Sequence, residues 1–434
     1  KLIPKMKFKS DEASLNVLKD DKPIAFYDVE VFPNLFIVNW KLQGVGRPMN
    51  RLINPTPHEI EMLMQYRLVG FNCRRYDNHI IYGALIGYSN IKLYELSQKI
   101  INNTRQGTFS EAYNISYTDV YDYATEKMSL KKWQIKLKIK HKELGLPWDQ
   151  PVPEDRWIEV AEYCDNDVIA TEAVFDYTAG DFRARQMLVA MTKAIRGIDV
   201  CVNDSTNSIT TKLIFGNEQK PQLNYVDLSI EFPGYEFVKT WNNKTQRYDK
   251  ANMYRGVDLG FGGYVYAEPG MYTDVVLMDV ESMHPNSGII MNYFGKYTPI
   301  FESIVKSRVY IKNGDLESAK AVFNGVLKPF LDDPTMSDDV ANALKIAINS
   351  VYGLTSARFN NAFRDPQNEN NIIALRGALF MKTLQDELVE RGLQVIHVKT
   401  DSIKVPNMDE IDIQFCHDFA AKYGYRFAHE YTFD

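Results

Sequence analysis

The sequence predicts a multidomain protein that combines an α/β part with an α+β part. The chain has 434 residues, enough for several domains of roughly 100–200 residues each. In its first half, strand-like segments run into helix-like segments that carry acids near their ends. In its second half, apolar strand-like runs alternate with longer stretches of helical periodicity.

The first part is expected to form an α/β domain over residues 1–185. Residues 24–40 are rich in β-branched and aromatic residues around a Pro-Asn turn, which predicts a hairpin. Residues 68–85 predict a strand that leads into a helix. Residues 156–178 have apolar residues at helical spacing and contain neither Gly nor Pro, so they predict one long helix.

The remaining segments predict a connector and then a second set of strands and helices. Residues 186–260 contain several prolines and Asn/Gly turns, which indicates a connector. A strand is expected over 273–280, with Pro285 as the stop after it. The later expectations are helices over 302–325 and 336–356 joined near Pro334, a helix over 371–391, a hairpin over 393–405, a helix over 409–422 and a strand over 425–434.

Composition is that of an ordinary globular protein, with 45% apolar and 24% charged residues. The net charge of −6 does not suggest a nucleic-acid binder, but affinity for phosphate depends on local basic patches. The four cysteines form no CxxC pair or Cys/His cluster, which argues against structural zinc and indicates a reducing cytoplasm. No apolar run is long enough to span a membrane, and no signal peptide is visible, so no membrane association is expected.

A first group of acids occurs at three places in the first half. Asp28 and Glu30 lie two apart on a predicted strand, so their side chains face the same side. Asp77 lies in FNCRRYD, and Asp167 follows Tyr163 by one helical turn. Phosphodiester hydrolysis uses hard divalent cations with oxygen ligands, and two cations about 3.5–4 Å apart activate water and stabilise the leaving oxygen. Together these acids could hold such a pair, with the tyrosine positioning water.

Each piece of this pattern alone has a simpler explanation, since two acids on a strand are more often solvated. Asp119 and Asp122 compete with Asp77 for the middle position, and Asp77 fits better because Asn72 and Tyr76 accompany it. The order DxE, N-x3-YD, Y-x3-D resembles that of the DEDD 3′→5′ exonucleases with tyrosine in the third motif. The resemblance implies an RNase H-like exonuclease domain. Its metal ligands would be Asp28, Glu30, Asp77 and Asp167, with Tyr163 as a further catalytic residue.

The second half resembles the polymerase core of family B DNA polymerases. DVESMHPNS (279–287) resembles motif A, KIAINSVYG (345–353) matches motif B, and HVKTDS (397–402) resembles motif C, in the family's order. The resemblance implies a right-hand architecture with a palm and fingers. The implied division is a connector over 186–260, palm over 261–301 and 356–434, and fingers over 302–355, with the thumb missing or incomplete.

The resemblance also implies residue roles in nucleotidyl transfer. Asp279, Asp401 and the Val280 carbonyl would hold two Mg²⁺ ions per active site, for which Mn²⁺ is a substitute. Arg308, Lys312 and Lys345 would meet the triphosphate, although solvated surface charge is an alternative for the first two. Side chains at the nucleotide would be Asn349, Tyr352 and Gly353 at the nascent base pair, and Ser282, Met283 and His284 at the sugar and triphosphate. A helix cap is the alternative reading of Gly353.

Two departures from the family pattern affect these expectations. His284 stands where tyrosine is usual, which puts exclusion of a ribose 2′-hydroxyl in doubt. Lys399 replaces the first motif C acid, and retained Asp401 leads us to expect that activity survives. GFGGYV (260–265) resembles an element that approaches template phosphates, or is a plain turn. Residues 126–142, which include Trp133, would contact single-stranded DNA or form a solvated, lysine-edged strand.

The expected function is therefore template-directed DNA synthesis with proofreading, of the compact bacteriophage type. Its partners would be primer–template DNA, dNTPs, single-stranded DNA at the exonuclease site, and a separate thumb or processivity subunit, in the host cytoplasm. Two alternatives stay open. One is an exonuclease with a decayed polymerase core, and the other is a non-catalytic DNA-binding subunit, against which the clustered like charges argue.

Overall fold

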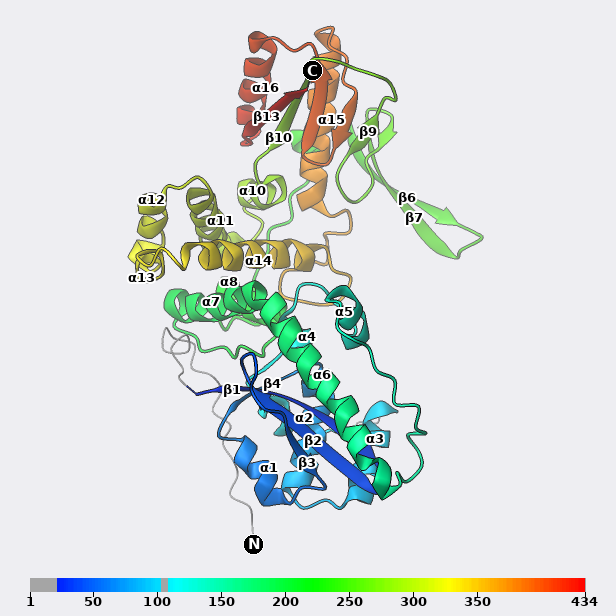
Figure 1. Cartoon of the computed structure of the whole chain (residues 1–434). Coiled ribbons are helices and arrows are strands. Elements are labelled where there is room, and N and C mark those ends of the chain that lie inside the picture. Colours follow the sequence, from blue (N-terminus) through cyan, green and yellow to red (C-terminus); the bar gives the residue numbers. More distant parts are fainter. Residues whose placement is uncertain (1–21, 103–107, 434) are drawn as a thin grey trace. The chain divides into compact units, whose positions relative to one another are not determined.

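A computed structural model describes residues 22–102 and 108–433 (Figure 1). The chain divides into two compact units. The first comprises Lys1–Ile209 and Pro329–Ala343, and the second comprises Thr210–Lys328 and Leu344–Asp434. The predicted multidomain α/β character is confirmed, with three β-sheets and many helices among the described residues. The finer division into exonuclease, palm and fingers stays a prediction.

A five-stranded mixed sheet forms the centre of the first unit, in the order β3-β2-β1-β4-β5. The predicted hairpin is confirmed, because β1 pairs antiparallel with β2, whereas β4 runs parallel to β1 and β5 parallel to β4. The strands are β1 (Ile24–Phe32), β2 (Leu35–Leu42), β3 (Asn50–Ile53), β4 (Arg67–Gly70) and β5 (Thr118–Asp119).

Helices cover both faces of this sheet. Alternate residues of β1, such as Val29 and Val31, belong to one buried cluster with residues of α2 and α3, whereas Phe32 belongs to another with residues of α6. The predicted long helix is confirmed as α6. The helices are α1 (Pro57–Leu63), α2 (Asp77–Leu85), α3 (Asn90–Ile101), α4 (Val120–Tyr123), α5 (Leu130–Lys136), α6 (Trp157–Tyr177) and α7 (Ala179–Arg196).

An antiparallel five-stranded sheet forms the centre of the second unit, in the order β13-β10-β12-β11-β9. The predicted strand, hairpin and final strand of this half are confirmed. The strands are β9 (Val265–Ala267), β10 (Val275–Val280), β11 (His397–Lys399), β12 (Ser402–Pro406) and β13 (Phe427–Phe433). The remaining helices of the chain are α8 (Thr206–Phe215), α9 (Leu228–Glu231), α10 (Met283–Ile290), α11 (Thr298–Lys312), α12 (Leu316–Ala321), α13 (Lys328–Leu331), α14 (Ser337–Ser356), α15 (Ile372–Glu390) and α16 (Glu410–Lys422).

The segment expected to be a connector contains regular structure instead. Its first residues continue α7, so residue 185 lies inside a helix, and α8 follows. A long hairpin of β6 (Tyr235–Asn242) and β7 (Arg247–Tyr254) then forms, with the short β8 (Val257–Asp258) beside it. Its prolines lie outside these elements, which is why they did not prevent them.

Two further expectations need correction, one for a helix and one for the end of a strand. The helix expected over 302–325 is interrupted, because Gly314 adopts a left-handed φ of 76° and Asp315 then caps α12 through the Ser318 amide. Pro285 does not end the preceding strand. It lies in the first turn of α10, where its missing N–H removes no helical hydrogen bond.

The lysine-rich stretch over 126–142 is not a strand. Ser129 caps helix α5 by accepting from the Lys132 amide, and the helix directs Trp133 inward, where it is 1% exposed. Trp133 packs edge-on against Tyr177 and is not available to stack on a base. In the described part of the chain, no helix is both long and apolar enough to cross a membrane.

Candidate active sites

Four acids from three elements line one pocket of the first unit, with a cavity volume of about 780 Å³. Asp28 and Glu30 point from β1 towards α6, because they alternate with the residues that face α2 and α3. Asp77 is the first residue of α2, and Asp167 comes from the middle of α6. Sequence-distant carboxylates therefore meet at one place in the fold.

Acids outnumber cations in the lining of this pocket, which includes four carboxylates and one arginine, Arg75. Burial, followed by the charges of Asp77 and Asp167, raises the pKa of Asp28 well above its usual range. Burial likewise raises the pKa of Glu30. Burial raises the pKa of Asp77 to about 7, although main-chain hydrogen bonds from its own N–H and from Val29 oppose the shift. Mutual repulsion of this kind is relieved by protons or by a divalent cation.

These residues fit a hard divalent cation. Ligand atoms of Asp28, Glu30 and Cys164 all lie within 4.8 Å of one another. Carboxylate oxygens are the donors that Mg²⁺ prefers, whereas burial raises the pKa of the Cys164 thiol and keeps it neutral. The Cys164 Sγ lies 3.5 Å from Asp28 Oδ2 and donates to it, so it supports the acid from the side of α6.

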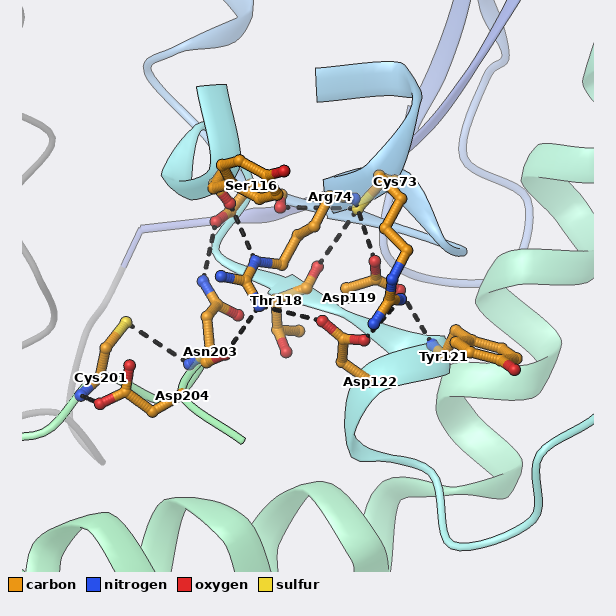
Figure 2. Close-up of polar contacts among 12 residues, drawn as sticks. Cys73, Arg74, Ser116, Thr118, Asp119, Tyr121, Asp122, Cys201, Asn203 and Asp204 are labelled. Atoms are coloured by element: carbon orange, nitrogen blue, oxygen red, sulfur yellow. Dashed lines mark hydrogen bonds and ion pairs between the residues drawn. The ribbon is translucent and has the colours of Figure 1, made fainter. Parts of the chain in front are cut away.

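The structure separates Asp77 from the two acids that compete with it in the sequence. Asp119 accepts main-chain hydrogen bonds from Arg74 at 3.0 Å and Tyr121 at 3.0 Å (Figure 2). It accepts a third from the Asn72 amide at 2.8 Å. These bonds fix the left-handed turn at Asn72, which precedes Asp77. Asp119 therefore orders the loop and does not line the pocket.

Asp122 is also engaged elsewhere. Its carboxylate accepts from Arg74 Nη1 at 3.0 Å and from Arg75 Nη1 at 2.8 Å. Arg74 Nη1 donates in addition to the Asn203 carbonyl at 2.7 Å (Figure 2). Arg75 lines the pocket, and the Asp122 ion pair holds its guanidinium there. It supplies the pocket with a cation that sequence reasoning missed, although the RR pair directly before YD is a visible pattern.

A chain of polar side chains leads from Asp167 to the surface, and sequence reasoning missed it too. Gln134 of α5 is 1% exposed, and its Nε2 donates to Asp167 Oδ1 at 2.8 Å. Its Oε1 lies 2.8 Å from His141 Nδ1, and His141 Nε2 lies 2.7 Å from Glu143 Oε1. Burial raises the pKa of Asp167, and the hydrogen bond from Gln134 opposes that shift. Gln134 thus orients one of the four acids.

Tyr163 lies one turn before Asp167 on the same helix. Burial and the nearby charges of Asp167 and Glu30 raise the pKa of its phenol, so it stays protonated at neutral pH. The ring of Trp148 packs against that of Tyr163, with the two ring centroids 6.4 Å apart. The tyrosine is thus close enough to the acids to feel their charge, and its hydroxyl remains a hydrogen-bond donor.

The two acids of the second unit come from adjoining strands. Asp279 of β10 pairs with Ser402 of β12, the residue that follows Asp401. The Val280 amide donates to the Asp401 carbonyl at 2.8 Å, so the two stretches meet along the main chain. Asp401 occupies the two-residue turn between β11 and β12, where Thr400 is left-handed with φ 58°. Both acids therefore lie at the same end of this strand pair.

The glycine-rich segment before β9 packs against that turn. A Cβ added to Gly263 would lie 2.4 Å from Thr400 Oγ1 and 2.6 Å from its Cα. The Thr400 amide donates to the Tyr264 carbonyl at 2.9 Å. The chain approaches the turn that carries Asp401 so closely at Gly263 that only glycine fits there. Packing within the fold is therefore enough to explain this glycine.

The named residues of KIAINSVYG share one exposed face of α14. Lys345, Asn349 and Gly353 are exposed and Tyr352 is half-buried, whereas Ala347, Ile348 and Val351 are buried on the other face. The helix-cap explanation of Gly353 is wrong, because α14 continues to Ser356. Nothing lies within 4 Å of a Cβ placed there. The fold gives no reason for this glycine.

His284 and Tyr352 come together as a stacked pair. Their ring centroids are 4.5 Å apart and their planes differ by 5°. Burial lowers the pKa of His284, and the nearby Asp401 opposes that shift, so His284 also lies near the second acid. Ser282 precedes it in a left-handed conformation with φ 49°. Met283 is 2% exposed and contacts Gly377, so its side chain faces the core.

The basic residues expected at the triphosphate lie on helix faces of the second unit. Arg308 and Lys312 are one turn apart on the continuous helix α11. Among the described residues, neither pairs with a carboxylate. Lys399 ends β11 with an exposed side chain, two residues before Asp401.

The sequence matches no protein-family profile and no curated protein sequence. One solved structure that resembles the chain is the family B DNA polymerase from the hyperthermophilic archaeon Pyrobaculum calidifontis, with a TM-score of 0.51 and 12% sequence identity. The match covers 95% of this chain and 57% of that polymerase. The chain therefore has a fold like that of part of a family B DNA polymerase.

Proposed function

We propose that the chain is a template-directed DNA polymerase that adds dNTPs to a primer 3′ end and proofreads with a 3′→5′ exonuclease. The proposal rests on one observation. In a family B-like fold, one acid set from well-separated stretches of sequence lines a single pocket of the first unit, and the two acids of the second unit lie at the same end of adjoining strands. A compact bacteriophage enzyme that works in the host cytoplasm is the finer form of this proposal.

In the first unit, an RNase H-like exonuclease site is proposed at the carboxylate pocket. Asp28, Glu30, Asp77 and Asp167 would hold two Mg²⁺ or Mn²⁺ ions, which supply a nucleophilic water and stabilise the leaving oxygen. The protonated Tyr163 would donate a hydrogen bond to that water, and Arg75 would contact the strand's phosphate. Among the described residues, the aromatic rings of Phe71, Tyr76 and Tyr121 also line the pocket and offer apolar faces to an unpaired 3′ end.

In the second unit, a palm-type site is proposed around Asp279, Asp401 and the Val280 carbonyl. These groups would hold the cations that neutralise charge on the transferred phosphate. The exposed face of α14, with Lys345, Asn349, Tyr352 and Gly353, would contact the dNTP and nascent base pair. Ser282 and His284 would lie at the sugar and triphosphate, where Met283 would contribute its main chain alone, because its side chain faces the core. Arg308 and Lys312 would extend the basic surface for the triphosphate.

A labelled primer–template tests the proposal directly. With Mg²⁺ alone the primer should shorten, and with Mg²⁺ and dNTPs it should lengthen. Asp401→Asn should abolish extension and leave shortening, whereas Asp28→Asn should abolish shortening and leave extension. Extension that persists in Asp401→Asn would contradict the palm assignment.

The second candidate function is that of an exonuclease whose polymerase core has lost activity. Exposed Lys399 in place of an acid, and His284 in place of tyrosine, favour it. It predicts shortening of the primer both with and without dNTPs. A non-catalytic DNA-binding subunit would bind the primer–template and produce neither result.

A further inference from the structure

The hairpin of β6 and β7 pairs with the short β8 at its base and extends beyond it as a two-stranded ribbon (Figure 1). Tyr235 and Tyr254 anchor its base and are buried. Beyond the middle of each strand, nearly every residue is exposed. The function proposed above uses none of these residues, and a ribbon that buries so little apolar surface has its outer half available to a partner.

One face of the ribbon carries an exposed aromatic pair. Side chains alternate along a strand, so the cross-strand pairs Lys239–Lys250 and Trp241–Tyr248 face the same side. Trp241 is 46% exposed and Tyr248 is 59% exposed. Their ring centroids are 5.0 Å apart with planes at 69°. The pair therefore presents aromatic surface to water at the outer end of the hairpin.

Basic residues flank this pair on both sides. Lys239 and Lys250 lie directly opposite each other, and Glu369 accepts from both, at 2.9 and 2.6 Å. That carboxylate offsets the repulsion of the two lysines. Towards the tip, Lys244 and Arg247 are exposed, and neither pairs with a carboxylate in the part of the chain that the structure describes. Lys244 lies in the turn, whereas Arg247, which pairs with Asn242, faces the side opposite the aromatic pair, so a bound strand would reach it around the tip. The outermost cations are therefore available to an anionic partner.

We propose that this tip binds single-stranded DNA, with unpaired bases stacked on Trp241 and Tyr248 and phosphates bound by Lys244 and Arg247. The choice of nucleic acid as the partner rests on the function proposed above. Exposed aromatics interleaved with cations are what single-strand binding requires, because every base offers a ring face and every nucleotide a charge. A duplex hides its base faces within the stack, so it would use the cations alone.

Binding without turnover tests the proposal. Fluorescence anisotropy of a labelled oligothymidylate, in EDTA, should show affinity falling roughly tenfold or more in the double variant Trp241→Ala, Tyr248→Ala. Trp241→Phe with Tyr248→Phe should keep most of the affinity, because the rings remain. Thr240→Ala is the matched control, since Thr240 lies on the opposite face of the same hairpin and should not change binding.

The charge contribution has its own measurement. Lys244→Gln with Arg247→Gln should make the dependence of log affinity on log salt shallower by roughly 1.4, about 0.7 for each phosphate contact. An unchanged affinity in the double alanine variant would overturn the proposal, as would a duplex that competes as well as the single strand. Because no metal is present, a failure of the proposed enzymatic activity leaves this binding intact, and the two failures can be told apart.

Discussion

The Nε2 of Gln134 donates to Asp167 Oδ1 at 2.8 Å, while its Oε1 faces His141 Nδ1 at the same distance. An amide held at both ends has one orientation, because reversing it would turn its oxygen towards the carboxylate. Gln134 therefore fixes Asp167 within the pocket before any cation binds. Loss of such a hydrogen bond to a metal-ligating carboxylate typically lowers metal affinity or activity by roughly 10- to 100-fold.

Gln134→Met is expected to lower Mg²⁺-dependent primer shortening by roughly 10- to 100-fold and to raise the Mg²⁺ concentration needed for half-maximal rate. Methionine keeps the length of the side chain and removes the donor. Gln43→Met is the matched control, because Gln43 donates at 3.5 Å to the exposed Asp176 outside the pocket. Equal Mg²⁺ requirements in wild type and Gln134→Met would contradict this role.

The stability of the metal-free protein should depend on pH through the acid pocket. The pKa of Asp77 is about 7 when folded and near 3.8 when unfolded, so the folded state holds more protons between these values. The free energy of unfolding should therefore fall as pH rises from about 4 to about 7, by an amount on the order of 4 kcal/mol for this group.

Chemical denaturation in EDTA at several pH values measures this effect. Asp77→Asn should flatten the profile and make the protein more stable than wild type at pH 8. Adding Mg²⁺ should restore wild-type stability most at the higher pH, because the cation replaces the lost protons. A profile that rises over this range in wild type would contradict the raised pKa of buried Asp77.

Gly353→Ala should stabilise the protein while impairing extension. The glycine lies inside α14, where alanine typically adds about 0.5–1 kcal/mol, and nothing in the fold opposes the added Cβ. If the helix face contacts the nascent base pair, the same methyl group obstructs that contact. Gly180→Ala, at a similarly open helical position in the first unit, should stabilise without affecting extension. Thermal unfolding and primer extension measure the two effects.

Gly263→Ala should destabilise the protein by about 1–3 kcal/mol, because the Cβ would overlap the side chain and main chain of Thr400. Displacing Thr400 moves Asp401, so extension should fall while primer shortening persists. Gly262→Ala is the neighbouring control, since a Cβ there meets nothing within 4 Å. Equal unfolding free energies for the two variants would contradict the close approach.

His284 should make sugar selection weak. The imidazole stacks on Tyr352 and is smaller than a tyrosine side chain. If the sugar of a nucleotide lies beside it, His284 would therefore exclude a ribose 2′-hydroxyl less well than tyrosine would. Wild type is expected to insert ribonucleotides readily, and His284→Tyr to improve discrimination roughly tenfold or more. Tyr352→Phe keeps the stacked ring, so it should not change the ratio of ribonucleotide to deoxyribonucleotide insertion. Primer extension with rNTPs and dNTPs in parallel gives the ratio.

Much of the fold could be predicted because periodicity is a local property. The long helix α6 and the hairpin of β1 and β2 follow from spacing and turn residues alone. The helix α5 was missed because its lysines alternate with apolar residues as in a strand, while the Ser129 cap decides for helix. The break at Gly314 was missed because a single glycine does not always interrupt a helix. The hairpin of β6 and β7 was missed because turn residues do not show which flanking segments pair.

Some residues of the candidate sites could be identified from local sequence, whereas others depend on tertiary contacts. Asp28 and Glu30 could be placed from their spacing on a strand, and the choice of Asp77 over Asp119 rested on neighbouring residues. The supporting groups Gln134 and Arg75 could not be identified, because their roles depend on tertiary contacts. The meaning of Gly353 changed as well, since only the structure shows that the helix continues past it.

The hydrogen bonds of Asp119 also affect how the carboxylate pocket forms. Because three main-chain amides hold its carboxylate, the turn that delivers Asp77 is shaped by the fold and needs no cation to form. The conformational entropy cost of ordering the pocket is met when the chain folds, so a cation would bind to a site that is already formed. Cation binding should therefore be fast and should not change the backbone conformation.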